Sequence, residues 1–273
     1  MKNTAFCPLN DYFIEYRNYT APHNMAVQHY HDSYEVYFLI SGMRNHFIGD
    51  EYFYIMPGDV MLVKPFELHY STSPEKFQYK RYVLNIKKHV LTHTFSQQEI
   101  EELFKIFDYR ILHLNEKEQS ELLNLLKKAD QVYHSNQFLS DKLYKYTTAE
   151  IFLFLKNVSD KRKITAPYQT DNEIIKAVRY INDRYTENIT LDDVTEFLHM
   201  SKYHFCRVFK QFTGATFLEY LNNLRLTEAH QLLIHTKKSI NEMALTTGFN
   251  STAHFTRVFK QVYSQSPREF RKA

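Results

Sequence analysis

The stretch SKYHFCRVFKQ, residues 201–211, returns as STAHFTRVFKQ at residues 251–261. Eight of the eleven positions are identical at a period of 50 residues, which predicts a duplicated supersecondary unit. In each copy a short segment, 191–198 or 240–247, precedes a turn and then a helix opened by a serine. This spacing predicts two helix-turn-helix units, joined by a helix over residues 217–236.

Each repeated helix has an apolar and a polar face. We expect the apolar positions, which recur at helical spacing, to face the core: Phe205, Val208, Phe209 and Phe212 in one copy, and Phe255, Val258, Phe259 and Val262 in the other. The opposite faces carry Lys202, Tyr203, Cys206, Arg207 and Lys210, and Thr252, Ala253, Thr256, Arg257 and Lys260. Two such helices could enter successive major grooves about 34 Å apart, with arginine reading guanine and lysine meeting phosphate. The alternative is a pair of ordinary amphipathic helices with solvated faces.

Several residues mark where these helices begin. Thr190 with Asp193, and Ser239 with Glu242, have the spacing of capping boxes. Ser201 and Ser251 are expected N-caps, and Ser266-Pro267 precedes a last short helix.

Charge is uneven along the chain, although the net charge is only +3. Residues 173–273 hold 14 lysines and arginines against 10 acidic residues, whereas the remaining 172 residues hold 20 against 21. A weakly basic C-terminal third permits nucleic-acid binding without proving it.

The segment 174–273 resembles the DNA-binding domain of the AraC/XylS transcriptional regulators. The resemblance lies in RLTEAHQLL (225–233), GFNSTAHFTRVFK (248–260) and SPREFR (266–271). It implies base contacts from Tyr203, Cys206 and Arg207 in the first unit, and from Thr252, Ala253, Thr256 and Arg257 in the second. Thr195 stands where the family usually has alanine, which bears on the packing of the first unit.

The N-terminal part has the sequence pattern of β-strands joined by turns. Runs of Tyr, Phe, Val and Ile at 34–40, 51–55 and 60–63 alternate with glycines and prolines, as in a sandwich or barrel. We therefore expect an α+β protein: a cupin-like β-barrel over residues 1–95, a helical dimerisation region over 96–157, a linker over 158–172 and an all-α domain with two helix-turn-helix motifs over 173–273.

Histidines and a glutamate stand in a motif that resembles those of cupin barrels: His29-x-His31-x3-Glu35, followed by Pro57-Gly58-Asp59 and by His69. Three imidazole nitrogens and a carboxylate could hold a divalent metal. The cupin-like sensors of the AraC/XylS family resemble the same pattern, and that resemblance implies a small effector. We expect the effector, with no metal and no cofactor.

Further polar residues alternate on the predicted strands. Glu35 and Tyr37 share one strand face, and Arg44 and His46 share one on the next strand. If both faces line the barrel, they form a small-molecule site together with His29, His31 and His69. A sugar or related metabolite is the first candidate, and a fatty acid is the alternative.

Composition excludes other classes. With 44% apolar and 24% charged residues the chain is a folded protein. The longest apolar runs have five residues, so no membrane span is predicted, and the first twenty residues lack a signal-peptide core. We therefore expect a cytoplasmic protein. Cys7 and Cys206 support neither a disulfide framework nor a cysteine zinc site.

These observations predict a ligand-responsive transcription factor rather than an enzyme. Its expected partners are double-stranded DNA, a small-molecule effector and a second copy of the chain, with RNA polymerase a further candidate and no membrane. The apolar stripe Leu122, Leu123 and Leu126 is the basis for expecting the homodimer. The alternatives are a cupin metalloenzyme with a DNA-binding tail and an architectural nucleic-acid-binding protein, which the modest net charge disfavours. The effector, the operator and the choice between activation and repression are not predicted.

Overall fold

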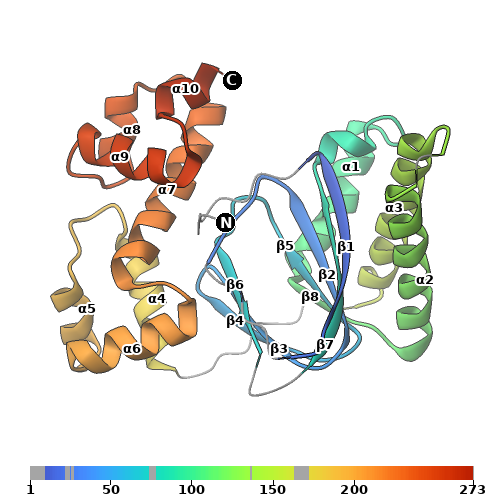
Figure 1. The fold of residues 1–273 in the computed structure, drawn as a ribbon, viewed down its shortest axis with the longest axis horizontal. Coiled ribbons are helices and arrows are strands. Elements are labelled where there is room, and N and C mark those ends of the chain that lie inside the picture. The colour runs from blue at the N-terminus through green and yellow to red at the C-terminus, as the bar shows by residue number, and fades with distance from the viewer. Residues whose placement is uncertain are drawn as a thin grey trace.

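A β-rich N-terminal domain and a helical C-terminal domain lie side by side in the computed structural model (Figure 1). The structure describes residues 10–21, 25, 28–73, 78–135, 137–162 and 172–272. The expected α+β architecture is confirmed.

Two antiparallel sheets form the N-terminal domain. One has the strand order β1-β7-β2-β5-β8 and the other β4-β3-β6. The strands are β1 (Tyr12–Tyr19), β2 (Tyr34–Ser41), β3 (Arg44–Ile48), β4 (Glu51–Ile55), β5 (Asp59–Val63), β6 (His69–Thr72), β7 (Tyr79–Ile86) and β8 (Ile111–His113). The strands predicted at 34–40, 51–55 and 60–63 are thus confirmed as β2, β4 and β5.

The predicted end of the barrel at residue 95 is wrong. Strand β8 lies in the region expected to be helical and pairs with β5, with His113 opposite Asp59. A strand of three residues is too short for alternation to reveal it, and pairing with the sheet holds it in place. Strand β1 precedes the first predicted strand and was not predicted from the sequence. It pairs with β7 at the edge of the large sheet.

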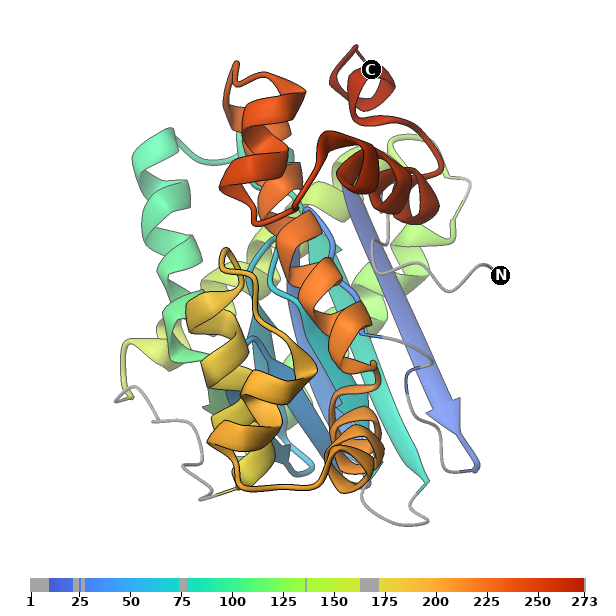
Figure 2. The same cartoon turned by 90° about the vertical axis from the view of Figure 1, so that its left-hand side faces the viewer.

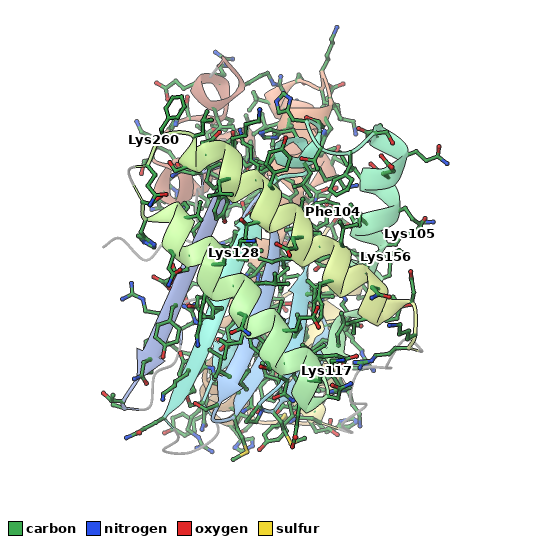
Figure 3. The ribbon with its side chains drawn as sticks, turned by 90° about the vertical axis from the view of Figure 1, so that its right-hand side faces the viewer. Phe104, Lys105, Lys117, Lys128, Lys156 and Lys260 are labelled. Atoms are coloured by element: carbon green, nitrogen blue, oxygen red, sulfur yellow. The ribbon has the colours of Figure 1, made fainter. Side chains whose placement is uncertain are left out.

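Helices cover the outer face of the five-stranded sheet (Figures 1 and 3). They are α1 (Gln97–Phe104), α2 (Glu116–Tyr133) and α3 (Ser140–Ser159), with the short 3-10 helices η1 (Lys88–Leu91) and η2 (Lys105–Tyr109). Leu122 and Leu126 are fully buried in the same cluster as Val36 and Leu84 of the sheet, and Leu123 packs against it. The stripe expected to form a dimer therefore packs on its own domain, because this face of the sheet needs an apolar cover.

The C-terminal domain consists of helices in the described part of the chain. They are α4 (Glu173–Arg184), α5 (Leu191–Phe197), α6 (Lys202–Thr213), α7 (Phe217–His235), α8 (Ile240–Thr246), α9 (Thr252–Tyr263) and α10 (Pro267–Lys272). Helix α7 joins the unit α5–α6 to the unit α8–α9 (Figure 2). Both predicted capping boxes and both serine N-caps are present. Of the predicted linker, residues 163–171 lie outside the described residues.

The two domains meet through the small sheet and the segments beside it. The rings of Phe47 and Phe212 lie 4.2 Å apart, and the Tyr220 hydroxyl donates to the Gly49 carbonyl at 3.4 Å. Tyr30 and Leu68 of the N-terminal domain are buried in the hydrophobic cluster of the helical domain. Among the described residues, no helix is both long and apolar enough to cross a bilayer.

Candidate functional site

A cavity of about 260 Å³ lies in the N-terminal domain between the two sheets. Side chains from β1, β2, β3, β6 and β7 reach it, together with Met25, His29 and His31 from the segment before β2. The full lining is Phe13, Glu15, Tyr19, Met25, His29, His31, Glu35, Tyr37, His46, His69, Ser71, Tyr79, Arg81, Val83 and Asn85.

Most of the residues predicted from the sequence meet at this cavity. Six of the seven line it: His29, His31, Glu35, Tyr37, His46 and His69. Arg44 is the exception, because its guanidinium donates to the Ser71 hydroxyl at 2.7 Å and to the Ser73 hydroxyl at 2.6 Å. It also stacks on the Tyr79 ring at 4.2 Å, so that it supports the wall instead of lining it.

Strand β7 supplies residues that the sequence reasoning missed. Tyr79, Arg81, Val83 and Asn85 all line the cavity, since alternate residues of a strand face the same side. This alternation was the available signal. Arg81 pairs with Glu15 of β1 at 3.0 Å, so that the cavity contains an arginine other than the expected Arg44.

Three histidines gather at one end of the cavity. His29, His31 and His69 each offer a ring nitrogen, and these nitrogens lie within 4.8 Å of one another. Backbone hydrogen bonds between His29 and His69, at 3.0 and 2.8 Å, hold the two segments together. His31 Nε2 lies 3.2 Å from Glu35 Oε2, and Asn85 Nδ2 donates to the same carboxylate oxygen at 3.3 Å.

Burial sets the protonation states of this cluster. Burial lowers the pKa of His69 to about 4, although Glu35 opposes the change. Burial and then the charge of Arg44 hold the pKa of His46 well below its usual value. Burial would raise the pKa of Glu35, but the hydrogen bond with His31 and the surrounding histidines outweigh it and keep the pKa below its usual range. At neutral pH the cavity thus contains a carboxylate beside the neutral imidazoles of His46 and His69.

Several buried polar atoms of the cavity have no hydrogen-bond partner within the described part of the chain. They are the Tyr37 hydroxyl, both ring nitrogens of His46, His69 Nε2 and Arg81 Nη1. An unsatisfied buried polar group costs about 1–3 kcal/mol. Such groups around one cavity are what a bound polar molecule would satisfy.

The second candidate site is the pair of repeated helices. On α6 all five residues of the predicted face are exposed: Lys202, Tyr203, Cys206, Arg207 and Lys210. On α9 Ala253, Arg257 and Lys260 are exposed, whereas Thr252 and Thr256 are partly buried. The Thr252 hydroxyl donates to Asn241 Oδ1 at 2.6 Å.

The opposite faces of these helices lie in the core. Phe205, Phe209, Phe255 and Phe259 are fully buried. Val208, Phe212 and Val262 are only partly buried, since they lie at the margin of the cluster. Thr195 is buried, and its hydroxyl donates to the Asp192 carbonyl at 3.1 Å, so that the first unit accommodates the departure from alanine.

Comparison with known proteins places both sites in one family. A family model described as an AraC-like ligand binding domain matches residues 13–143, and one described as a helix-turn-helix domain matches residues 194–273. The probable transcription factor PqrA of Proteus vulgaris is 39% identical over 101 residues, which are 37% of this chain and 82% of PqrA. The chain belongs to the AraC/XylS family.

Two other relatives show how far the likeness to AraC/XylS regulators extends. The regulatory protein PocR of Salmonella typhimurium is 30% identical over 174 residues, so the match covers 59% of this chain and spans only 57% of PocR. The HTH-type transcriptional activator RhaS of Enterobacter sp. is 24% identical over 90% of this chain and 87% of RhaS. This member of the AraC/XylS family is therefore a DNA-binding transcriptional regulator with an N-terminal ligand-binding domain.

Proposed function

We propose that this AraC/XylS regulator binds a small polar metabolite, with a sugar or sugar derivative as the first candidate, in the cavity between its two sheets. The single observation that carries the proposal is the set of buried polar atoms around the cavity that have no hydrogen-bond partner among the described residues, on Tyr37, His46, His69 and Arg81. A ligand with several hydroxyl groups can both donate to the imidazole nitrogens and accept from Arg81. An acyl chain would leave most of these groups unsatisfied.

The cavity wall has two sides, and this gives the effector a route to the DNA-binding domain. His29, His31 and His69 face the cavity, whereas the neighbouring Tyr30 and Leu68 are buried in the hydrophobic cluster of the helical domain. A ligand that moves the histidines must therefore move side chains on which α7 and its neighbours pack. We propose that the effector acts on DNA binding through this wall.

We further propose that the polar faces of α6 and α9 bind DNA. The predicted contacts stay as stated from the sequence: Lys202, Tyr203, Cys206, Arg207 and Lys210 on one helix, and Thr252, Ala253, Thr256, Arg257 and Lys260 on the other. Their support is the exposure of the α6 face and of Arg257, together with the helix-turn-helix match. RNA polymerase remains a candidate partner.

A homodimer is part of the proposal, but through a different surface from the one expected. Helix α3 and the residue before it expose the apolar side chains Leu139, Leu143, Tyr146 and Leu153, at the helical spacing of one stripe. Figure 3 views the face of the molecule on which α2 and α3 lie. We expect full-length protein to sediment as a dimer and Leu143→Glu to sediment as a monomer. Leu245→Glu, at an exposed leucine on α8, is the matched control.

Effector binding is tested by a thermal-shift screen of sugars, other small metabolites and fatty acids against the full-length protein. A compound that binds only the folded state raises the melting temperature. Tyr37→Phe should reduce the shift, because it removes one unsatisfied hydroxyl, whereas Tyr16→Phe, outside the cavity, should not. Turnover of a compound by the protein would instead favour the metalloenzyme alternative.

A further inference from the structure

We propose that the effector is a sugar acid, whose carboxylate binds Arg81 at one end of the cavity while its hydroxyl groups face the other end. This inference rests on the proposed effector site and names the class of compound that the site selects. The residues that bind the carboxylate are Arg81 on β7, Tyr37 on β2 and His46 on β3, and all three line the cavity.

Arg81 brings a positive charge into the cavity that its acidic partner does not fully balance. The Glu15 carboxylate lies 3.0 Å from Arg81 Nη2 and 2.6 Å from Arg17 Nη2, so two guanidinium groups share one carboxylate. A guanidinium group is not deprotonated in proteins, so both arginines are charged. Two positive charges against one negative charge leave an excess of one positive charge. Arg81 presents this charge to the cavity, whereas Arg17 is exposed and lies outside the cavity lining.

Hydrogen-bond donors gather around this charge. Arg81 Nη1, the Tyr37 hydroxyl and both ring nitrogens of His46 are buried and have no hydrogen-bond partner among the described residues. The rings of Tyr37 and His46 lie 4.6 Å apart, and the Arg81 guanidinium lies 5.7 Å from the centre of the Tyr37 ring. Burial outweighs the nearby arginine charges and raises the pKa of Tyr37, so its hydroxyl stays protonated and can donate. An anionic oxygen at this point would satisfy donors from three strands of the two sheets.

The carboxylate at the other end of the cavity is already balanced. Glu35 pairs with Asn85 in the register of β2 and β7, and Asn85 is four residues from Arg81, which is about 13 Å along a strand. His31 Nε2 lies 3.2 Å from Glu35 Oε2, and His31 Nδ1 lies 2.9 Å from the Ser33 carbonyl. An ionised carboxylate and a carbonyl only accept, so the His31 ring carries both protons and its charge balances that of Glu35. An anionic effector therefore places its charge at the Arg81 end and neutral hydroxyl groups towards Glu35.

The donors and the space favour a sugar acid over other anions. Arg81 Nη1, the Tyr37 hydroxyl and one N–H of the neutral His46 ring are three donors, which suit the two oxygens of a carboxylate. A phosphate group has three strongly accepting oxygens, and these donors would leave several acceptor positions unmet. A fatty acid has the carboxylate but no hydroxyl group for His69 Nε2, which is buried without a partner among the described residues. The cavity of about 260 Å³ is small for a ligand pocket, which suits a monosaccharide.

The experiment compares matched acidic and neutral compounds on the full-length protein. The pairs are D-glucuronate with D-glucose, D-galacturonate with D-galactose, and D-gluconate with sorbitol, and D-glucose 6-phosphate and laurate represent the other anions. Thermal shifts and calorimetry measure binding without any assay of DNA binding. We expect at least one sugar acid to raise the melting temperature and to bind at least about 10-fold more tightly than its neutral partner, because hydrogen bonds to charged groups are the stronger ones.

Substitutions at Arg81 test the anchor itself. Arg81→Gln should weaken binding of the sugar acid about 10–100-fold and remove the preference over its neutral partner. Arg81→Lys keeps the charge and should lose less affinity than Arg81→Gln. Arg17→Gln is the matched control, because Arg17 contacts the same Glu15 carboxylate from outside the cavity and its loss should change affinity little. Circular dichroism checks that each variant folds.

The outcomes separate this inference from the proposed effector site. If a neutral sugar raises the melting temperature as much as its acid partner, the sugar-acid assignment fails while the effector site stands. A larger shift from D-glucose 6-phosphate or laurate than from any of the sugar acids would also overturn the assignment. If Arg81→Gln keeps the affinity for the acid, or if Arg17→Gln loses as much, Arg81 is not the anchor. If none of the sugars or sugar acids binds, both proposals fail.

Discussion

The two helix-turn-helix units share eight of eleven residues over their second helices but differ in their surroundings. Gly214 ends α6 and Ser264 ends α9, each with a left-handed φ, of 76° and 64°. A Cβ atom at Gly214 would overlap the ring of Tyr70 in the sensor domain, whereas the Ser264 side chain is exposed. The glycine is thus required by the neighbouring domain and not by the turn alone.

The contacts of the two units with the sensor domain also differ in chemistry. The first unit meets it through Phe212, whose ring packs on Phe47. The second unit meets it through His230 of α7, which contacts Tyr263 of α9 on one side and Tyr30 and Phe66 on the other. The two units therefore keep the same buried residues in the repeated helix but make different contacts with the sensor domain.

The largest expected effect comes from making the first unit like the second at its helix end. Gly214→Ser should destabilise the contact between the domains by about 2–4 kcal/mol, because overpacking against Tyr70 adds to the cost of a left-handed non-glycine residue. Hydrogen exchange of β3, β4 and the end of α6 should accelerate. Ser264→Gly is the control and should change little. Unaltered exchange in Gly214→Ser would show that the contact with Tyr70 does not hold the domains together.

Much of the helical domain could be predicted, because each helix start is a local signal. Thr190 with Asp193 and Ser239 with Glu242 identify their helices by side-chain spacing alone, and the capping boxes are present. The contact of Gly214 with Tyr70 could not be predicted, since the two residues are far apart in sequence and belong to different domains.

In the sensor domain the histidine motif led to four of the cavity residues and strand alternation to two more, Tyr37 and His46, but Arg81 and Asn85 were missed. They lie on β7, whose alternation is visible in the sequence but carries no motif. Leu122 was assigned to a dimer because periodicity shows that a face is apolar, not what covers it.

The next largest expected effect is a loss of affinity for the cognate DNA site when a proposed base contact is removed. Arg207 and Arg257 hold equivalent exposed positions, so Arg207→Ala and Arg257→Ala should each cost about 1–3 kcal/mol at the cognate site. Each should relax preference at a different base pair and leave non-specific binding nearly unchanged. Titrations on cognate and scrambled duplexes measure both quantities. Equal weakening on the two duplexes would mean that these arginines do not read bases.

Low pH should destabilise the contact that His230 makes between the second unit and the sensor domain. Burial lowers the pKa of His230 to about 4, against about 6.5 in an unfolded chain. The folded state therefore binds fewer protons, and its stability is full above about pH 6.5 and is lost as the pH falls towards 4. Between pH 7 and pH 5 the loss from this group is about 2 kcal/mol. Urea unfolding at both pH values should show a smaller loss in His230→Phe than in wild type, and an identical loss would refute the assignment.

The smallest effect separates phosphate contacts from base contacts on the same two helices. Lys210 and Lys260 each lie three residues, just under one helical turn, beyond the predicted base-reading residues Arg207 and Arg257, and both are exposed. A lysine that neutralises one phosphate releases its counterion, so that each loss lowers the slope of log affinity against log salt by about one unit. Lys210→Ala and Lys260→Ala should therefore weaken binding to cognate and scrambled duplexes alike. Titrations at several salt concentrations give the slopes. Lys128→Ala is the control, because α2 lies on the other side of the strands from α6 and α9 (Figure 1). If Lys210→Ala lowers the slope and Lys260→Ala does not, only the first unit contacts a DNA phosphate at this position. The two units would then differ in their DNA contacts as well as in their contacts with the sensor domain.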